Sequence, residues 1–315
     1  MNFNYQDSPL LISGLHYKLA GRRRDLEQLE AEDLLAGSVD TLRQIGYRYS
    51  FGLSPDETLL NLSASPLSAS LSDCTNAAAA IFQHCYAESA VLPWDPEDRD
   101  VGTRNRYFAG ALLRELGREE LPYFCSFASG CAGFVFLCIA AAGVLSSTKE
   151  GEVICAMADS MPKGVTHDLS RERILGSAQS SAFVVGRDKG KYQLLGTSIY
   201  STTRALVPLL ELVKRTVSMI TGLAQSLGLD LAANEVLVHY PNMFPDAWKM
   251  VTRHLRLSDE QHIMRGMAER AHCGGSDSVI SLSDVYQGKQ GRLHFVVNYG
   301  LGLHLGICAF REIAE

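Results

Sequence analysis

The sequence lacks the cysteine spacings that bind structural zinc. Its eight cysteines include no CxxC pair and no compact group of Cys and His residues. We therefore expect no metal site, and we expect reduced thiols in a cytoplasmic protein. The opening residues, MNFNYQDSPL, have neither the basic start nor the apolar run of a signal peptide, which supports that localisation.

The sequence also has little positive charge to offer a nucleic acid. Its formal net charge is -6, and its densest basic run is the short segment 22–24. Proteins that bind nucleic acids are normally basic overall or carry a long basic stripe. We therefore expect no nucleic-acid partner.

Charged residues are absent from one long segment, residues 121–148. It is longer than the roughly 20 residues that a membrane span needs. Pro122 and the small polar residues Ser126, Ser129 and Gly130 divide it into a short strand and an apolar helix over 132–147. We expect this helix to be buried at the centre of a soluble domain and not to span a membrane, with a membrane protein as the alternative.

The remaining chain alternates between strand and helix patterns, which predicts an α/β protein. The pattern predicts a charged helix within 22–46 and an alanine-rich helix within 73–87. No linker-like or low-complexity run separates the parts. We expect two α/β halves packed as one unit, residues 1–165 and 166–315.

Cys131 follows the short strand and precedes the apolar helix. A thiol at a helix N-terminus loses its proton more easily, because the helix dipole and free amide groups stabilise the thiolate. Gly130 and Gly133 allow a tight turn there. By itself this pattern also fits a packed core cysteine.

Four segments resemble the β-ketoacyl-ACP synthase III branch of the thiolase superfamily, in the right order and over residues 75–312. They are FASGCAGFVFLCIAAAGVL, ILGSAQSSAFVV, VHYPNMFPDAW and GRLHFVVNYGLGLHLGICAFRE. The resemblance implies a five-layer αβαβα thiolase-like fold of two similar halves. The first half would carry the nucleophile Cys131 and the second the catalytic His239. It also implies a substrate-contacting Asn242 and an oxyanion hole formed by the backbone at Cys131 and Leu301.

The sequence departs from the family where an asparagine normally assists decarboxylation of a malonyl thioester. The corresponding segment reads AHCGGSDSVISL, which places Gly274 at the asparagine position. His272, Ser276 or Asp277 could supply a polar group instead, and we include His272 and Asp277 among the candidate catalytic residues. The same three residues could equally be ordinary loop residues.

Two groups of basic residues are candidates for binding the acyl donor. Arg48 matches one arginine of the family's coenzyme A motif, while Ser50 replaces the other. Lys249, Arg253 and Arg256 recur at i, i+4 and i+7 and predict one helix face that binds an acidic carrier protein. A solvated helix face is the plainer alternative.

These observations predict an acyltransferase of the β-ketoacyl synthase III type. Cys131 would accept an acyl group from an acyl carrier protein or coenzyme A thioester and pass it to a second substrate. The setting would be fatty-acid-derived, polyketide or other specialised biosynthesis, with phosphopantetheine arriving as part of the substrate and no tightly bound cofactor. Decarboxylative condensation with malonyl-ACP is one alternative, and a non-catalytic subunit of a ketosynthase heterodimer is another. We expect a homodimer or a heterodimer with a related subunit.

Overall fold

The structure is a computed structural model of the chain. It describes residues 1–92, 106–127, 129–148, 150–169, 173–204, 207–232, 235–300 and 303–314.

The first half of the chain builds five neighbouring strands of the main sheet. They lie in the order β2-β10-β7-β5-β6, with β5, β6 and β7 parallel to one another. Their bounds are β2 Leu10–Leu19, β5 Ala77–Gln83, β6 Tyr123–Ser126, β7 Glu152–Asp159 and β10 Gln179–Gly186. If these five strands are numbered by their order along the chain, their spatial order in the sheet is first, fifth, fourth, second, third.

The second half repeats that order. Its strands lie as β11-β15-β14-β12-β13, again first, fifth, fourth, second, third. Their bounds are β11 Tyr192–Ser201, β12 Val236–His239, β13 His262–Ile263, β14 Leu293–Gly300 and β15 His304–Glu312. The short β1, Asn2–Asn4, pairs with β11. Because β2 also pairs with β11 over Leu10–Ile12, the described strands form one eleven-stranded sheet.

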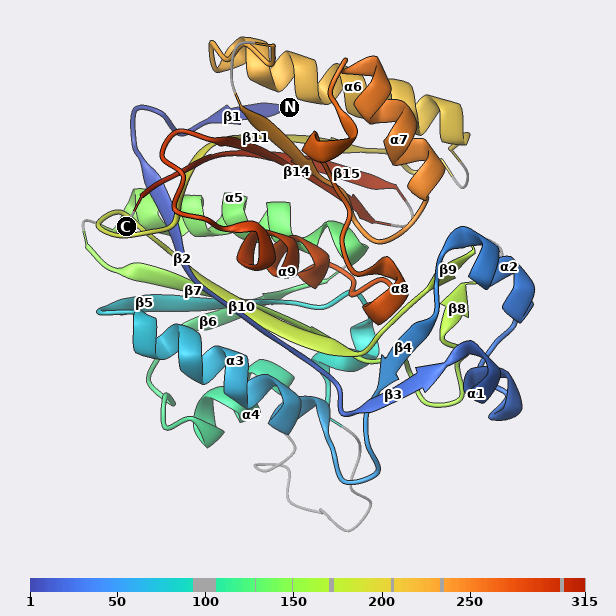
Figure 1. Ribbon diagram of the computed structural model, residues 1–315. Coiled ribbons are helices and arrows are strands. Elements are labelled where there is room, and N and C mark those ends of the chain that lie inside the picture. Colours follow the sequence, from blue (N-terminus) through green and yellow to red (C-terminus); the bar gives the residue numbers. More distant parts are fainter. Residues whose placement is uncertain are drawn as a thin grey trace.

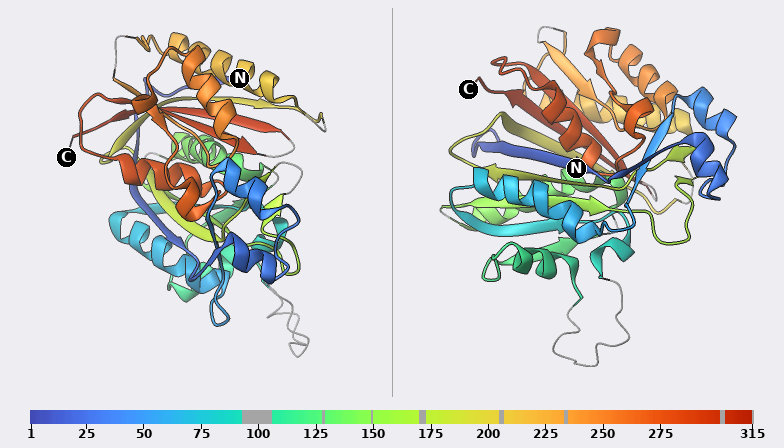
Figure 2. Two further views of the ribbon diagram at one scale, coloured as in Figure 1. Left: turned by 45° about the vertical axis from the view of Figure 1, so that its right-hand side comes forward. Right: turned by 60° about the horizontal axis from the view of Figure 1, so that its bottom comes forward.

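Helices complete a five-layer arrangement (Figure 1). One pair covers the outer face of the first half, one pair covers the outer face of the second, and α5 and α9 lie between the two halves (Figure 2). The bounds are α3 Leu59–Asp73, α4 Phe108–Glu115, α6 Leu209–Ser226, α7 Pro245–His254, α5 Gly133–Ser147 and α9 Ser276–Val285. The predicted fold class is therefore confirmed, and α5 and α9 occupy equivalent places, each between the third and fourth strands of its half.

Three buried apolar clusters hold the layers together. The central one joins α5 to strands of both halves, through residues such as Phe134, Phe183 and Phe310. The other two pack α6 and α7, or α3 and α4, against the outer faces. Removing this apolar surface from water is the main force that favours the layered arrangement.

The apolar helix α5 belongs to the central layer. The stretch Gly130–Ser147 is long and apolar enough to cross a membrane, and 44% of it is buried inside the protein. Core helices of layered proteins share this composition, since they contact apolar side chains on several faces. Its position between the two halves of the sheet fits the predicted central helix (Figure 1).

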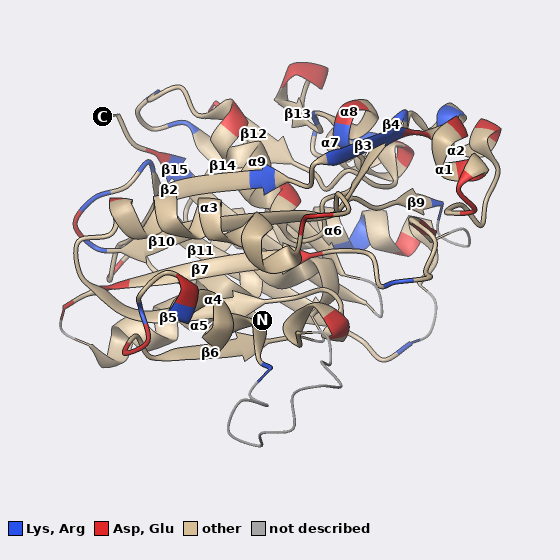
Figure 3. Ribbon diagram, turned by 90° about the horizontal axis from the view of Figure 1, so that it is seen from below, with Lys and Arg blue, Asp and Glu red and all other residues tan. Residues whose placement is uncertain are grey.

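A smaller group of elements projects from one end of the layers. It consists of three short helices and two hairpin-like strand pairs. The bounds are β3 Arg22–Asp25, α1 Leu26–Ala31, α2 Val39–Ile45, β4 Tyr49–Gly52, β8 Asp168–Leu169, β9 Ile174–Leu175 and α8 Met267–Arg270. Charged residues concentrate here and on the outer helices, whereas the central strands are nearly free of charge (Figure 3). Three short helical turns lie elsewhere, and their bounds are η1 Ala87–Ala90, η2 Gly130–Ala132 and η3 Asp259–Gln261.

Two predicted helices are wrong. The segment 22–46 forms β3, α1 and α2 instead of one helix, because Asp25 caps α1 and Ser38 caps α2, which starts a second helix within the segment. The alanine-rich segment contains β5 instead of a helix, since its alanines pair with both β6 and β7 in the sheet. Tertiary pairing overrides the helix propensity of alanine.

The second set of five strands begins later in the chain than the predicted division at residue 165. Strand β10 pairs with β7 and β2 of the first half, and β11 is the first strand of the second. The change therefore falls between Gly186 and Tyr192.

Candidate active site

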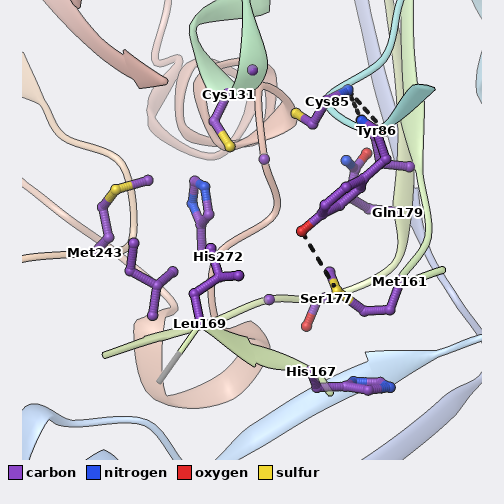
Figure 4. A pocket seen from close by; sticks show the side chains of 15 residues that line it. Cys85, Tyr86, Cys131, Met161, His167, Leu169, Ser177, Gln179, Met243 and His272 are labelled. Atoms are coloured by element: carbon purple, nitrogen blue, oxygen red, sulfur yellow. Dashed lines mark hydrogen bonds between the residues drawn. The ribbon is translucent and has the colours of Figure 1, made fainter. Parts of the chain in front are cut away.

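A pocket of about 200 Å³ opens where the central helices begin. It lies beyond the carboxyl ends of the parallel strands β5, β6 and β7, the position where α/β sheets usually bind ligands. Both halves contribute to its wall (Figure 4). The lining residues are Cys85, Tyr86, Gly130, Cys131, Asp159, Met161, His167, Leu169, Ile174, Gly176, Ser177, Gln179, Met243, His272 and Gly274.

Cys131 sits in the tight turn η2 directly before α5. Gly130 has a φ of 50°, a backbone conformation that glycine adopts most easily. Gln83, at the end of β5, donates a hydrogen bond from Nε2 to the Gly130 carbonyl oxygen at 2.9 Å. A side chain at Gly133 would clash with Gln83, since its Cβ would lie 1.9 Å from Oε1. These contacts fix the turn and hold the Cys131 thiol toward the pocket (Figure 4).

His272 faces Cys131 from the start of the other central helix. Its Nδ1–H group donates to Asp277 Oδ2 at 2.6 Å, so Nε2 points toward the Cys131 sulfur (Figure 4). Among the described residues, Nε2 has no other hydrogen-bond partner. The backbone of His272 is fixed as well, by hydrogen bonds to Leu175 and from Ser177 at 2.9 Å each. The structure thus brings three predicted residues, Cys131, His272 and Asp277, into one row.

Asp277 is held in place by three further donors. The backbone amide of Asn242 donates to Oδ2 at 2.9 Å, and the amide of Cys273 donates to Oδ1 at 3.1 Å. The Asn242 side chain donates to the Ala271 carbonyl oxygen at 2.9 Å and lies 3.4 Å from Asp277 Oδ1. Asn242 therefore supports the carboxylate from behind and does not line the pocket, although it had been predicted to contact the substrate.

Cys85 lies beside the Cys131 thiol (Figure 4). It follows β5, and its backbone amide donates to the Asp159 carboxylate at 2.8 Å. Asp159 ends β7 and also accepts a hydrogen bond from the Tyr86 amide. Burial raises the pKa of Asp159 to about 7. This side of the pocket thus carries a second thiol and a second carboxyl group.

The surroundings of Cys131 favour its thiolate. A hydrogen bond from the Cys85 thiol is the largest cause, the nearby His272 adds to it, and together they lower the pKa of Cys131 to about 5 against the opposing effect of burial. The hydrogen bond to Cys131 and burial raise the pKa of Cys85 well above its usual value, so Cys85 stays a protonated donor. Burial lowers the pKa of His272, but the Cys131 and Asp277 charges outweigh it and raise that pKa to about 10. At neutral pH the pair can therefore exist as thiolate and imidazolium.

His239 lies elsewhere, in the core of the second half. It is 1% exposed, and it is not among the described residues that line the pocket. Its Nδ1 contacts Ser281 Oγ at 2.7 Å and its Nε2 contacts His294 Nδ1 at 2.9 Å, while His294 reaches Glu312. With both ring nitrogens engaged in the core, His239 does not work beside Cys131 in this geometry, contrary to the expectation from sequence. The histidine that faces the thiol is His272.

Gly274 has a φ of 57° and sits against Cys85. A Cβ atom at this position would lie 3.1 Å from the Cys85 sulfur. An asparagine would therefore be strained by its backbone and crowded by its neighbour. Changing Gly274 to asparagine would therefore not simply restore the missing amide group, because the local backbone favours glycine.

The backbone at Gly300 approaches the Cys131 turn closely. A Cβ atom there would lie 2.3 Å from the Ser129 carbonyl oxygen and 3.3 Å from the Cys131 nitrogen. The last strands therefore reach the amide that was predicted as one oxyanion donor. Leu301, predicted as the other, lies outside the described residues.

The basic candidates lie on the surface and away from the pocket lining. Arg48 is exposed just before β4, and Lys249 and Arg253 are exposed on α7. Arg256 does not continue that face, because α7 ends at His254 and Arg256 has a φ of 58°. The predicted three-residue stripe is therefore reduced to Lys249 and Arg253.

Sequence reasoning missed Cys85, Asp159 and Gln179 as pocket residues. The first two follow parallel strands, so their places beyond β5 and β7 could have indicated them. The prediction of a helix at 73–87 hid that signal. In the described part of the chain, no three His, Cys, Asp or Glu residues lie close enough to hold a metal ion.

Comparison with known proteins finds likeness at the level of structure. No protein-family model matches the sequence, and no curated protein matches it either. Among solved structures, ChlB3, described as an acyltransferase, superposes with a TM-score of 0.76 at 13% identity, covering 97% of this chain and 98% of that one. The 3-oxoacyl-(acyl carrier protein) synthase III of Pseudomonas aeruginosa PAO1 gives 0.73 at 16%, covering 96% and 98%.

A third structure, the 3-oxoacyl-[acyl-carrier-protein] synthase III of Aquifex aeolicus VF5, gives a TM-score of 0.71 at 15% identity and covers 96% and 98% of the two chains. The coverage is nearly complete in all three cases, so the likeness extends to both halves and to the two central helices. The chain therefore has the thiolase-like fold of the 3-oxoacyl-ACP synthase III enzymes.

Proposed function

We propose that this protein is an acyltransferase that carries the acyl group as a thioester on Cys131. The observation that supports this most strongly is the row formed by Cys131, His272 and Asp277, with the His272 Nδ1 hydrogen-bonded to Asp277 at 2.6 Å. A nucleophile, a base and a group that orients the base are the parts that covalent acyl transfer requires. Their position in a buried pocket excludes most water, which protects a thioester from hydrolysis.

The first step exchanges one thioester for another. The Cys131 thiolate attacks the carbonyl carbon of the donor thioester, so a new carbon–sulfur bond forms and the donor carbon–sulfur bond breaks. The departing thiolate takes the proton from His272 Nε2 and leaves as a free thiol. Backbone donors at Cys131 stabilise the oxyanion that forms during the attack.

The second step transfers the acyl group to an acceptor. His272, now neutral, takes the proton of an acceptor hydroxyl or amine as the acceptor attacks the Cys131-bound carbonyl carbon. The carbon–sulfur bond breaks, and the thiolate–imidazolium pair is restored. Asp277 keeps the imidazole in the orientation that both steps need.

We favour an oxygen or nitrogen acceptor over decarboxylative condensation. Condensation with a malonyl thioester needs stabilisation of an enolate, and losing one donor of that kind typically costs about 3 kcal/mol. Gly274 supplies no such donor, and His272 is engaged with Cys131. Rapid release of labelled carbon dioxide from malonyl-ACP by the acylated protein would favour condensation instead.

The donor is an acyl thioester of an acyl carrier protein or of coenzyme A. A carrier would contact Lys249 and Arg253 by charge, and Arg48 would contact the nucleotide of coenzyme A. The pocket volume of about 200 Å³ lies below the range of most drug-sized sites, which favours a small acyl group. The setting we propose is fatty-acid-derived, polyketide or other specialised biosynthesis.

A non-catalytic subunit is the competing function. A scaffold has no need of a lowered thiol pKa, so the pKa of about 5 at Cys131 speaks against it. Steady-state kinetics separates the two functions. An acyltransferase releases free thiol from the acyl donor, with ping-pong dependence on donor and acceptor, and loses that activity in Cys131→Ala. A scaffold releases none above the rate without protein.

A further inference from the structure

Gln179 presents an unused hydrogen-bond donor to the pocket. It begins β10, it lines the pocket on the side of Cys85 and Tyr86, and it is only 1% exposed (Figure 4). Its Nε2 atom has no hydrogen-bond partner among the described residues. A buried amide donor without a partner is destabilising, so it is expected where a ligand completes the bond.

Two serines fix which end of this amide faces the pocket. Ser276 Oγ donates to Gln179 Oε1 at 2.5 Å, and Ser276 Oγ lies 2.6 Å from Ser181 Oγ. In this order Ser181 donates to Ser276, which donates to Gln179, so both hydroxyl protons are used. With the amide reversed, Nε2 would donate to Ser276, and one of the two serine hydroxyl protons would have no acceptor among the described interactions. The oxygen therefore faces the serines and the Nε2–H donor faces the pocket.

The donor lies apart from the backbone groups that would hold the thioester oxygen. Those groups surround Cys131 and Gly300, whereas Gln179 Nε2 lies 3.4 Å from the place where a side chain at Gly274 would begin. Cys85 lies next to that same place, at 3.1 Å. An acyl chain that extends from Cys131 toward the Gly274 side of the pocket would therefore reach Gln179 Nε2.

We propose that Gln179 selects the acyl group by donating a hydrogen bond to a hydroxyl or keto oxygen on the acyl chain. This inference rests on the proposed acylation of Cys131 and adds the chemical class of the acyl substrate. A site built to bond a substrate oxygen rejects the analogue that lacks it, because the buried donor is then left unpaired. Met161, Leu169 and Met243 line the pocket with apolar side chains, whereas the Tyr86 hydroxyl donates to the Met161 sulfur at 3.7 Å and Ser177 Oγ accepts from the Phe51 amide at 2.9 Å.

The test compares acylation rates for three small thioesters of N-acetylcysteamine. The 3-hydroxybutyryl and 3-oxobutyryl thioesters carry the oxygen, and the butyryl thioester lacks it. Acylation of Cys131 is followed by intact mass, and each rate is divided by that of the butyryl thioester. These ratios cancel any general loss of activity in a variant.

In Gln179→Met, which keeps the side-chain length and removes the donor, both ratios fall by about tenfold or more relative to the unchanged protein. Ser276→Ala lowers them partly, since the amide can then reverse. Ser180→Ala is the matched control on the same strand. It removes a buried hydroxyl that bonds to Met157 at 3.3 Å outside the pocket, and it leaves the ratios unchanged.

The outcomes separate this inference from the proposed function. If none of a wider panel of thioesters, including acyl-ACP and acyl-CoA, acylates Cys131, the proposed function fails and the inference with it. If Cys131 is acylated but Gln179→Met keeps the ratios of the unchanged protein, only the selection by Gln179 is overturned. A fall confined to Gln179→Met and Ser276→Ala supports it.

Discussion

At the scale of single residues, the main result concerns which histidine faces the thiol. The sequence motif favoured His239, because it follows a strand and precedes Asn242 in the family's order. The structure buries His239 between Ser281 and His294 and brings His272 to Cys131. Ala271, directly before His272, has a φ of 54°, which is costly for a residue with a side chain. That backbone conformation depends on long-range contacts, so local sequence could not reveal where His272 points.

The two histidines predict opposite mutant phenotypes. His272→Gln removes the proton carrier and should lower the acylation rate of Cys131 by roughly 100-fold or more. His239→Gln should leave that rate within about threefold but lower the midpoint of thermal unfolding, because a buried hydrogen-bond network is disturbed. Stopped acylation reactions analysed by mass and a thermal melt measure both effects. The reverse pattern would return the catalytic role to His239.

The cysteine pair predicts an unusual pH profile of alkylation. Only the thiolate reacts with iodoacetamide. With a pKa of about 5, Cys131 is already a thiolate at pH 6, so its alkylation rate should change little between pH 6 and 8. A thiol with the ordinary value of 9.0 would instead react roughly tenfold faster with each pH unit over that range.

Cys85→Ala tests the cause of this profile. The variant removes the largest contribution to the low pKa, so the inflection of Cys131 should move to higher pH. Peptide mapping separates Cys131 from the exposed Cys125, which serves as an internal reference. An inflection near pH 9 in the unchanged protein would contradict the proposed thiolate–imidazolium pair.

At the scale of elements, local signals identified the helices and strands that carry strong patterns. The uncharged apolar run predicted α5. Prediction failed at β5, since a central strand made of alanines has no period that distinguishes it from a helix. It failed again at Arg256, because the end of α7 depends on the backbone turn that follows His254.

The exposed face of α7 predicts a selective effect on carrier-protein substrates. Reversing charge at Lys249 and Arg253 to Glu should lower kcat/KM for acyl-ACP by roughly tenfold, an effect that added salt should reduce. Acylation by a small N-acetylcysteamine thioester should be unchanged, since it makes no contact with the helix. Lys214→Glu on the exposed face of α6 is the control. Equal losses for both donors would show that α7 does not bind the carrier.

At the scale of the whole molecule, the repeated strand order places the two central helices against each other. Cys131 begins one helix, and the His272–Asp277 pair lies at the start of the other. The resemblance of four separate segments predicted this architecture. The division of the halves could not be placed from sequence, because β10 pairs back onto the first half through contacts far apart in the chain.

The edge of the sheet predicts a dimer of this chain. Strand β6 forms the edge of the sheet on the side of the first half. It carries the exposed aromatic residues Tyr123 and Phe124, and Phe127, just beyond it, is 58% exposed. An open strand edge with apolar side chains is normally covered by a partner. We expect light scattering to give twice the chain mass of 34.5 kDa, and Phe124→Lys to shift the protein toward monomer. A monomer at micromolar concentration would contradict a second copy as the occupant of this edge.

The central claim is that Cys131 carries the acyl group with the help of His272. The most direct measurement is the site and stoichiometry of acylation, read by intact mass and peptide mapping after incubation with a panel of acyl thioesters. We predict one acyl group per chain, located on Cys131, absent in Cys131→Ala and formed roughly 100-fold more slowly in His272→Gln. A label on another residue, or an unchanged rate of labelling in His272→Gln, would contradict the account.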